Sequence, residues 1–497
     1  MSSRLSAIDA SFWFMEHPST PMHAGGVAVF ELPAAGFDHE QLVRLVRQRI
    51  ALVPRYRQRV REVPFGFARP VWVDDEHFDV AFHVRRTAVA KPGSEEQLDE
   101  LVARLMSRPL DRTRPLWEMY LIEGLAEGRF AIVTKSHQAL VDGISAVDIA
   151  QVLLDEQPDV PGTPVDTWRA EREPSEIELT SQAVTELLTR PAVAVDAART
   201  AITDVSRTAG AVAERATGIV AAALAIARPS VPSPLNVSIG RHRLFRTVDL
   251  SLDDFRTVRA RLGGTVHDAM LSVIAGGLRS WLLARGTGVQ QGDRLRVLLP
   301  MSIEVPAAAS GQAGGSRVSA NVVDLPIGEA DPAVRLQQIG YQLAQLEQGG
   351  HFVAAEDIAG IAGFGPPTLH ALGARLTSGF ASKVYNLVVT NVPGPQRPLY
   401  AAGARMLAAY PVVPLTANQA LSIGVTSYDG GVYLGLYADR DALPDVELIA
   451  ECMRSSMDEL ISRAAAHKHA GLRVVRDART GMDPAAGSVS KGSRELA

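Results

Sequence analysis

Strand-like and helix-like patterns of apolar and polar residues alternate along this chain. Residues 25–31 and 129–137 have the pattern of strands, whereas apolar residues within 95–106 recur with helical spacing. A similar mixture resumes in the second half of the chain. We therefore predict an α/β protein with an N-terminal unit over residues 1–155 and a C-terminal unit over residues 241–465.

The segment over residues 156–240 has a different composition. Its prolines bracket two Ala-rich stretches, which predicts a crossover linker that contains helices. Its most apolar run, 218–227, is far shorter than the roughly 20 residues that a membrane-spanning helix needs. We expect a packed helix there, with insertion at a membrane interface as the alternative. Residues 466–497 lack apolar periodicity, which predicts a disordered tail.

Composition limits the class of protein. With 497 residues and 46% hydrophobic content, the chain can bury at least one large core. Cys452 is the only cysteine, so an internal disulfide framework is excluded, and Asp9 interrupts the region where a signal peptide needs an apolar core. The net charge of -5 argues against a nucleic-acid-binding protein. We expect a cytoplasmic protein that acts on small molecules or lipids.

Charged and histidine residues give few further candidates for a binding site. Arginines stand at every second position from Arg55 to Arg61, so a strand there displays guanidinium groups on one face. We expect a solvated edge strand, and the alternative is a site for the phosphates of a ligand. The scattered histidines have no metal-ligand spacing, and no Walker-type glycine loop is present. We therefore predict no metal site.

The stretch from Lys135 to Ser145 is the most informative part of the sequence. The predicted strand leads into it, and Gly143 allows a turn before a helix that begins near Ile144. If the strand persists, His137 and Gln138 point to opposite faces, so His137 reaches the position of a base at 138 only through a twist at the strand end. Asp142 is expected to cap the helix or pair with an arginine.

This stretch resembles the His-His-x-x-x-Asp-Gly signature of the wax ester synthase/diacylglycerol acyltransferase family, in its actinobacterial type. His137, Asp142 and Gly143 match the signature, but Gln138 stands where the family has its second histidine, which the resemblance identifies as the base. An amide cannot act as a base near neutral pH. Gln138 is therefore expected at most to hold the acceptor hydroxyl, and activity is expected to be weak.

Further segments carry the same resemblance. Pro115, Leu116 and Trp117 are similar to the family's Pro-Leu-Trp segment, although these residues also suit a loop and a buried core. Other family blocks are similar to residues 20–26, 233–240 and 386–400.

The segment over residues 263–270 is similar to the family's Asn-Asp segment, with His267 in place of the asparagine. Thr265 and Asp268 have the spacing of a capping box, which makes Asp268 chiefly a capping residue. The field at the helix start favours neutral imidazole at His267, the form that a general base needs. An ordinary surface histidine is the alternative. From the motif segments we take as catalytic candidates His137, Gln138, Asp142, Gly143 and His267, and as substrate-binding candidates Pro115, Leu116, Trp117 and Asp268.

The resemblance implies two chloramphenicol acetyltransferase-like subdomains, each a mixed β-sheet with flanking helices, and a tunnel between them. It also implies transfer of an acyl group from acyl-coenzyme A, a co-substrate, to diacylglycerol or a long-chain alcohol, without a resident cofactor. Contact with a membrane or lipid droplet is a further expectation. Two alternatives remain: a degenerate homologue that binds acyl-coenzyme A or lipid without turnover, and a condensation-type enzyme that uses a carrier-bound acyl group.

Overall fold

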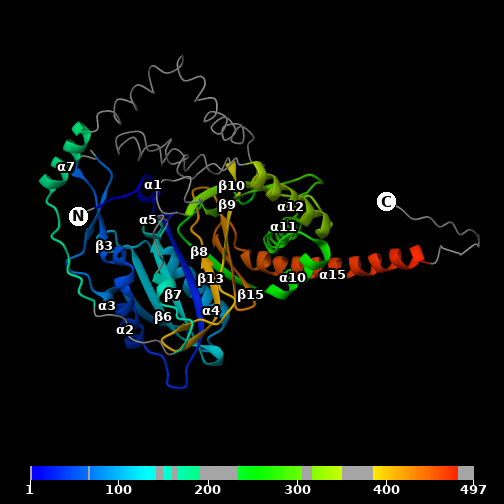
Figure 1. Cartoon of the computed structure of the whole chain (residues 1–497), viewed down its shortest axis with the longest axis horizontal. Helices are drawn as coiled ribbons and strands as arrows, with labels where there is room; N and C mark the ends of the chain where they lie inside the picture. Colours follow the sequence, from blue (N-terminus) through cyan, green and yellow to red (C-terminus); the bar gives the residue numbers. More distant parts are fainter. Residues whose placement is uncertain are drawn as a thin grey trace, which may run out of the picture.

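The computed structural model describes residues 3–64, 68–141, 149–158, 166–189, 233–304, 316–349 and 384–479. Two six-stranded sheets form the framework, and a small three-stranded sheet accompanies the first. The two halves lie side by side, with the N-terminal elements in blue and cyan and the C-terminal elements in green to red (Figure 1). The predicted α/β class is confirmed.

The first large sheet is mixed. Its strand order is β12-β13-β2-β7-β6-β5, in which β5 is parallel to β6 and the other neighbours are antiparallel. The strands, in chain order, are β2 (His23–Glu31), β5 (Val84–Ala88), β6 (Trp117–Leu125), β7 (Arg129–His137), β12 (Tyr400–Ala401) and β13 (Ala404–Val412).

Helices and a small sheet surround these strands. Three of the helices begin at capping boxes, in which Ser6, Asp38 and Ser94 accept a hydrogen bond from the backbone three residues later. The helices of the first half are α1 (Ala7–Met15), α2 (His39–Arg49), α3 (Val80–His83), α4 (Glu95–Ser107), α5 (Gln138–Val141) and α6 (Ile149–Val152), with short 3-10 turns at Ile50–Leu52, Pro54–Arg57 and Ala126–Gly128. The small sheet contains β1 (Ser3–Arg4), β3 (Gln58–Arg61) and β4 (Val71–Asp74).

The second large sheet is also mixed. Its order is β10-β9-β11-β14-β15-β8, and β11 is parallel to both of its neighbours. Its strands are β8 (Arg243–Ser251), β9 (Leu295–Glu304), β10 (Ser316–Leu325), β11 (Leu387–Pro393), β14 (Leu421–Tyr428) and β15 (Gly431–Asp439).

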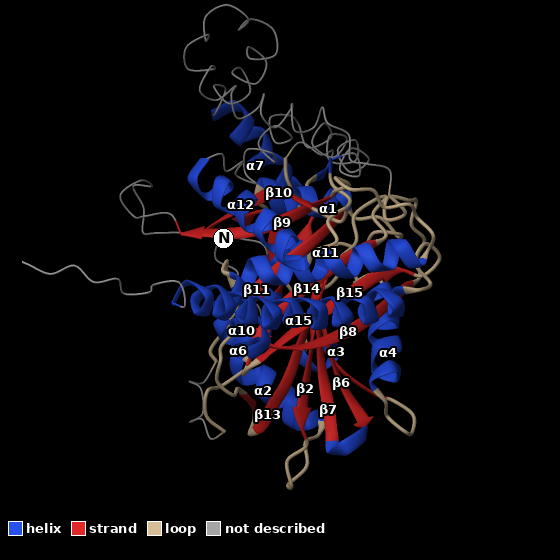
Figure 2. Cartoon of the chain, turned by 90° about the vertical axis from the view of Figure 1, so that its right-hand side faces the viewer, coloured by secondary structure: helices blue, strands red, loops and turns tan. Residues whose placement is uncertain are grey.

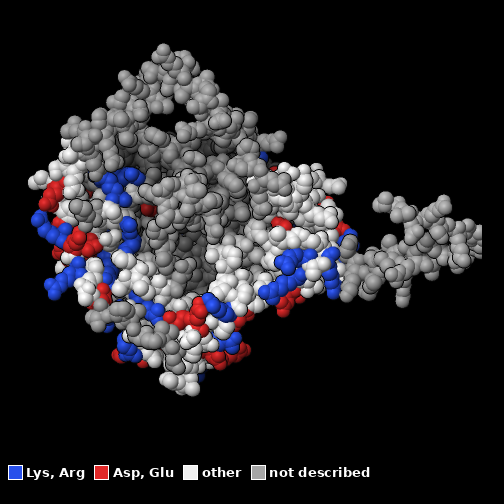
Figure 3. Space-filling model, viewed as in Figure 1, with Lys and Arg blue, Asp and Glu red and all other residues white. Residues whose placement is uncertain are grey.

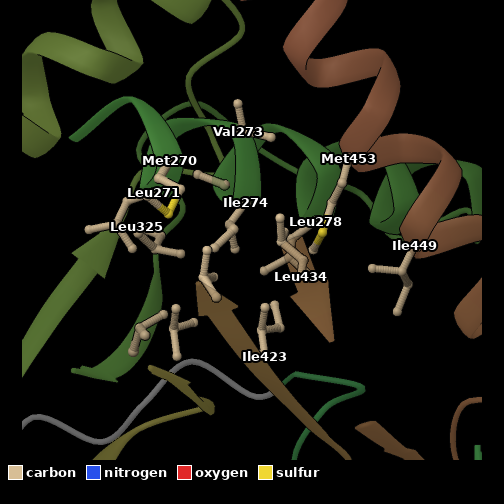
Figure 4. Close-up of a cluster of buried hydrophobic side chains, with 14 of the residues drawn as sticks. Met270, Leu271, Val273, Ile274, Leu278, Leu325, Ile423, Leu434, Ile449 and Met453 are labelled. Carbon is tan, nitrogen blue, oxygen red and sulfur yellow. The ribbon is translucent and has the colours of Figure 1, made fainter. Parts of the chain in front are cut away.

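In the described part of the second half, four helices pack with the second sheet: α10 (Leu252–Leu262), α11 (Val266–Ala284), α12 (Pro332–Gly349) and α15 (Val446–Arg479). Figure 2 shows α11 and α15 beside each other against these strands. In the core between helices and sheet, Ile274 and Leu278 of α11 point toward Ile423 and Leu434 of the strands, and Met453 of α15 lies beside them (Figure 4). Burial of these apolar side chains holds the helices on the sheet.

The second half of the chain contributes two strands to the first sheet. β12 and β13 belong by sequence to the predicted C-terminal unit, yet β13 pairs with β2 and extends the first sheet. Alternate residues of β13, including Met406, Ala408 and Val412, are buried in the cores of that sheet. Long-range pairing of this kind leaves no local signal in a sequence, and the predicted unit boundaries do not include it.

The start of the predicted linker lies against the first half. Arg57 is buried in an ion pair with Asp166 and stacks on Trp168, 4.8 Å from the ring centre. Arg59 forms an ion pair with Glu173. Arg57 and Arg59 are therefore occupied by carboxylates of this chain, and the expected solvated strand is wrong for Arg57, which lies in a 3-10 turn before β3.

The linker continues into helix α7 (Glu176–Thr189). The apolar run 218–227 lies outside the described residues. Among the residues that the structure describes, no helix is long and apolar enough to cross a membrane. At the other end of the chain, α15 passes the predicted start of the disordered tail and continues to Arg479, because Ala, Leu, Lys and Arg favour helix even without an apolar stripe.

Candidate active site

Three of the segments singled out in the sequence meet at the end of β7. The His137 backbone N–H donates to the Leu116 carbonyl at 2.9 Å, and the Gln138 N–H donates to the Met22 carbonyl at 2.9 Å. His23 of β2 is the direct cross-strand partner of His137. The altered motif, the Pro-Leu-Trp segment and the block around residues 20–26 are thus adjacent in space.

His137 ends the strand and shapes the turn that follows. β7 stops at His137 and α5 begins at Gln138, so strand alternation does not continue across the pair. The His137 Nδ1 accepts a hydrogen bond from the Ala139 backbone N–H at 3.0 Å. In the neutral ring the proton is therefore on Nε2, which lies 3.9 Å from Glu16 Oε2.

His137 is a poor candidate for the base. Burial, followed by the positive charge of Arg112, lowers the pKa of His137 from 6.5 to about 3. Its Nδ1 lone pair is also occupied by the Ala139 amide. A ring of this kind does not take a proton near neutral pH, so the geometry favours a role in holding the turn and donating from Nε2.

Gln138 stands at the position that the signature assigns to the base. Its side chain is half-buried, and its backbone is anchored to Met22. An amide can donate and accept hydrogen bonds, but it cannot accept a proton near neutral pH. Asp142 and Gly143 lie outside the described residues, so their predicted roles stay predictions.

Glu16 is a residue of this region that sequence reasoning missed. It follows α1, and its buried carboxylate Oε2 lies 3.2 Å from Arg112 Nε. The Arg112 guanidinium lies 3.5 Å from the ring centre of Trp13 and donates to the Trp13 carbonyl. Burial raises the pKa of Glu16, against the influence of Arg112, the Met22 backbone and Lys135. We call Trp13, Glu16, Arg112 and His137 the Glu16 cluster.

Two further buried groups lie near this cluster. His23 Nε2 is 2.6 Å from the Met106 carbonyl, and burial lowers the pKa of His23 well below its usual value. Lys135 is fully buried and donates to the Leu105 and Arg108 carbonyls at the end of α4. Burial lowers the pKa of Lys135 to about 8, although Glu118 opposes this effect. His23 and Lys135 lie in strands β2 and β7, and nothing in the sequence marks them as buried polar groups.

The Pro-Leu-Trp segment forms part of the core. Pro115, Leu116 and Trp117 are all buried. The Trp117 indole donates to the Tyr56 carbonyl at 2.7 Å and stacks on His83, with 4.6 Å between ring centres. These contacts favour a packing role. Their predicted role in substrate binding stays a prediction, and the segment's visible function is to position the end of β7.

The candidates of the second half form a separate group. Asp268 and Thr265 form the predicted capping box at the start of α11: the Thr265 N–H donates to Asp268 Oδ2 at 2.7 Å, and the Asp268 N–H donates to Thr265 Oγ1 at 3.0 Å. His267 Nδ1 lies 2.8 Å from Asn391 Nδ2. Asn391 is on β11, within the block 386–400, so two family-like segments meet here. From the sequence we predict that Gln138 and His267 both lie near the interface between the two subdomains, and this closeness stays a prediction.

Metal ligation finds no support in the part of the chain that is described: within those ranges, no group of three or more His, Cys, Asp or Glu side chains is arranged to hold a metal ion. What the first group of residues offers instead is a buried carboxylate, a neutral imidazole and an amide within one region. Such a set suits hydrogen bonding to a neutral polar ligand and transfer of a proton.

Comparison with known proteins places the chain in a family. The family model described as "Wax ester synthase/diacylglycerol acyltransferase catalytic domain" matches residues 5–270, and "WS/DGAT C-terminal domain" matches residues 314–461. A Mycobacterium tuberculosis protein named "Probable diacyglycerol O-acyltransferase tgs3" is 47% identical over 52% of this chain and 97% of its own length. Another, named "Probable diacyglycerol O-acyltransferase tgs1", is 32% identical over 93% of this chain and 96% of its own length.

Solved structures support the same assignment. The wax ester synthase/diacylglycerol acyltransferase from Marinobacter aquaeolei VT8 is 28% identical, with a TM-score of 0.65 over 93% of this chain and all of that one (100%). The first condensation domain of the calcium-dependent antibiotic synthetase is 17% identical, with a TM-score of 0.58 over 94% of this chain and 96% of that one, which shows a shared fold alone. The predicted two-subdomain fold is thereby confirmed, and this chain belongs to the wax ester synthase/diacylglycerol acyltransferase family.

Proposed function

We propose that this chain is an acyl-coenzyme A-dependent O-acyltransferase that makes triacylglycerol from diacylglycerol, with long-chain alcohols as a second class of acceptor that would yield wax esters. The observation that carries the proposal is the near full-length similarity to a mycobacterial protein named a diacylglycerol O-acyltransferase. The names of the relatives favour turnover over the degenerate, binding-only alternative. The condensation-type alternative has only a shared fold in its support.

The reaction needs a proton acceptor and a polar, water-poor site. The hydroxyl oxygen of the acceptor attacks the carbonyl carbon of the thioester, a C–O bond forms and the C–S bond breaks. The hydroxyl proton moves to a base, and the sulfur of coenzyme A leaves as a thiolate that takes up a proton. Hydrogen-bond donors stabilise the negative charge on the carbonyl oxygen. Neither a resident cofactor nor a metal is part of this proposal.

We further propose that the chain is of the actinobacterial type and that Gln138 replaces the second histidine of the signature. The two Mycobacterium tuberculosis relatives support the type. In this proposal Gln138 holds the acceptor hydroxyl, Asp142 and Gly143 shape the turn, and His267 with Asp268 lines the site from the second half. Loss of a general base typically costs about 10²–10⁴ in rate, so low activity is expected.

The location of the enzyme follows from its proposed substrates. Diacylglycerol and long-chain alcohols partition into lipid, whereas acyl-coenzyme A carries a polar, charged head. We propose that the enzyme works in the cytoplasm in peripheral contact with a membrane or lipid droplet. Figure 3 shows Lys and Arg side chains gathered over α10 and the neighbouring part of α15, a surface suited to anionic lipid. Co-flotation with anionic but not with neutral vesicles tests this contact.

A direct assay tests the function. The purified full chain is incubated with acyl-labelled acyl-coenzyme A and either diacylglycerol or a long-chain alcohol, and labelled triacylglycerol or wax ester is measured. The proposal expects ester that depends on the enzyme and on both substrates. Binding of acyl-coenzyme A without any ester, across both acceptor classes, would establish the binding-only alternative instead.

A further inference from the structure

The Glu16 cluster contains a buried donor and a buried acceptor, neither of which has a hydrogen-bond partner among the described residues. These atoms are His137 Nε2 and Glu16 Oε1, and both are enclosed. The 3.9 Å between His137 Nε2 and the other carboxylate oxygen, Oε2, is too long for a hydrogen bond. Buried polar groups are nearly always hydrogen-bonded, so this pair points to a missing partner.

The chemistry of the two atoms defines that partner. His137 Nε2 carries the ring hydrogen, because Nδ1 accepts from the Ala139 amide. An ionised Glu16 Oε1 can only accept. A hydroxyl group has one hydrogen to donate and lone pairs that accept, so one hydroxyl placed between the two atoms satisfies both. Among the substrates of the proposed reaction, the acceptor alcohol has this chemistry.

The Glu16 cluster is directly connected to the altered motif. The Met22 carbonyl accepts the hydrogen bond from the Gln138 backbone. A hydrogen bond from the Met22 backbone also stabilises the Glu16 carboxylate. One residue therefore links the carboxylate to the position where the signature places the base.

The other titratable groups of this region are less suited to take the proton. The Lys135 ammonium is fully buried and donates to the Leu105 and Arg108 carbonyls beside Glu118. His23 is already bonded to Met106 through Nε2. Low pKa values make both His23 and His137 weak bases. Burial raises the pKa of Glu16, which makes its carboxylate a stronger base than an exposed one.

We infer that Glu16 accepts the proton of the acceptor hydroxyl in this chain, while His137 Nε2 donates a hydrogen bond to the same oxygen. The inference rests on the proposed acyltransferase function and adds a residue outside the signature. As the hydroxyl oxygen bonds to the thioester carbon, its proton moves to Glu16. The C–S bond breaks and the sulfur leaves with the electron pair. The resulting thiolate then takes up the proton that Glu16 received from the alcohol. Both atoms are enclosed, so alcohol binding has to move neighbouring side chains apart.

The charges around Glu16 determine its pH response. Arg112 and Lys135 favour the ionised carboxylate, His137 is neutral, and burial opposes ionisation. The pKa of Glu16 is raised as the net result. Acyl transfer should therefore fall as the pH drops through this raised value and Glu16 becomes protonated.

Glu16→Gln tests the inference in the full chain, because it keeps the shape and removes the proton acceptor. We expect the turnover number to fall by about 10²–10⁴, with a much smaller change in the KM for acyl-coenzyme A. Glu62→Gln is the matched control, since Glu62 accepts a hydrogen bond from the Trp13 indole at 2.9 Å in the same neighbourhood. An amide oxygen still accepts this bond, so the control should keep the native rate.

Two further variants separate proton transfer from packing. Glu16→Asp keeps a carboxylate, and we expect a reduced rate that still falls at low pH, a dependence that Glu16→Gln should lack. Adding Gln138→His to Glu16→Gln supplies an imidazole at the position of the signature base. We expect this double variant to regain acyl transfer. If Glu16→Gln only disturbed the packing, a new base at position 138 would not restore the rate.

The outcomes distinguish this inference from the proposed function. Suppose that the native chain makes ester while a folded Glu16→Gln variant keeps the native rate and pH profile. In that case only water bonds to His137 Nε2 and Glu16 Oε1, the inference is wrong, and the proposed function stands. If Glu16→Gln does not fold, a Glu16→Asp variant without the low-pH decline overturns the inference. A native chain that makes no ester from any acyl-coenzyme A and alcohol pair overturns both.

Discussion

Arg243 and Asp439 form a buried ion pair between β8 and β15 of the second sheet, and Arg243 also reaches the first half of the protein. Arg243 Nη1 lies 3.1 Å from Asp439 Oδ2, and the side chains of both residues are 1% exposed. Arg243 Nη2 also donates to the Ser19 carbonyl. Ser19 precedes the segment that ends at Met22, whose carbonyl anchors Gln138. Arg243, held in place by Asp439, thus connects the C-terminal half to the support of the candidate active site.

Replacing Arg243 by methionine should strongly destabilise the fold. The change leaves Asp439 buried without its counter-charge, and breaking one side of a buried ion pair typically costs about 3–5 kcal/mol. Denaturant unfolding of Arg243→Met measures the effect. Asp439→Asn in the same chain should recover part of the loss, because an amide oxygen still accepts from the Gly240 backbone without a charge. A loss below about 0.5 kcal/mol, the usual range of surface changes, would contradict the prediction.

Trp117→Phe distinguishes a packing role from a substrate-binding role for the Pro-Leu-Trp segment. The change removes the hydrogen bond to the buried Tyr56 carbonyl, so the free energy of unfolding should fall by about 1–3 kcal/mol. At a temperature where the variant is folded, we expect an unchanged KM for acyl-coenzyme A and for the acceptor. A raised KM with native stability would instead identify Trp117 as a substrate contact.

Local patterns in the sequence are sufficient to predict several helices and strands that surround the site. The strand predicted over residues 129–137 has the observed bounds of β7, and the helix predicted from Glu95 is α4. The Thr265 and Asp268 capping box is also confirmed. In each case neighbours within a few residues determine the structure, through side-chain alternation or a side chain that caps its own helix.

The roles of individual side chains in the site depend on contacts that are distant in sequence. Glu16 is distinctive only because Arg112, on another segment, faces it and because both are enclosed by Trp13 and His137. Its sequence neighbourhood has no motif that marks it. His137 lies inside the signature, yet its Nδ1 accepts a hydrogen bond from the Ala139 amide, a contact that residue spacing does not reveal.

His137 should make the stability of the fold dependent on acid. The pKa of His137 is about 3 in the folded protein and 6.5 in the unfolded chain, so the unfolded state binds more protons between these values. Stability should therefore decline as the pH falls from about 6.5 toward about 3. His137→Asn removes the titrating ring but keeps an acceptor for the Ala139 amide. Denaturant unfolding across this pH range should show a weaker decline in the variant, and an identical decline in both proteins would contradict the assignment.

Gln138→His tests whether the altered position limits the reaction. Position 138 is half-buried, and its backbone is held by Met22, so an imidazole there can be placed without a change in the strand. A histidine at this position restores the full signature, and we expect acyl transfer to rise by up to about 10²–10⁴ if no other group now acts as base. If Glu16 already accepts the proton, the gain in rate from Gln138→His should be smaller. This gain should become larger when both the native chain and the Gln138→His variant also carry Glu16→Gln.

Ester formation from labelled acyl-coenzyme A and diacylglycerol, at matched amounts of folded protein, measures both gains in rate. Gln138→Asn is the control for a changed side chain without a base and should show no gain. An unchanged or lower rate in a folded Gln138→His variant would mean that this position is not where the proton is transferred.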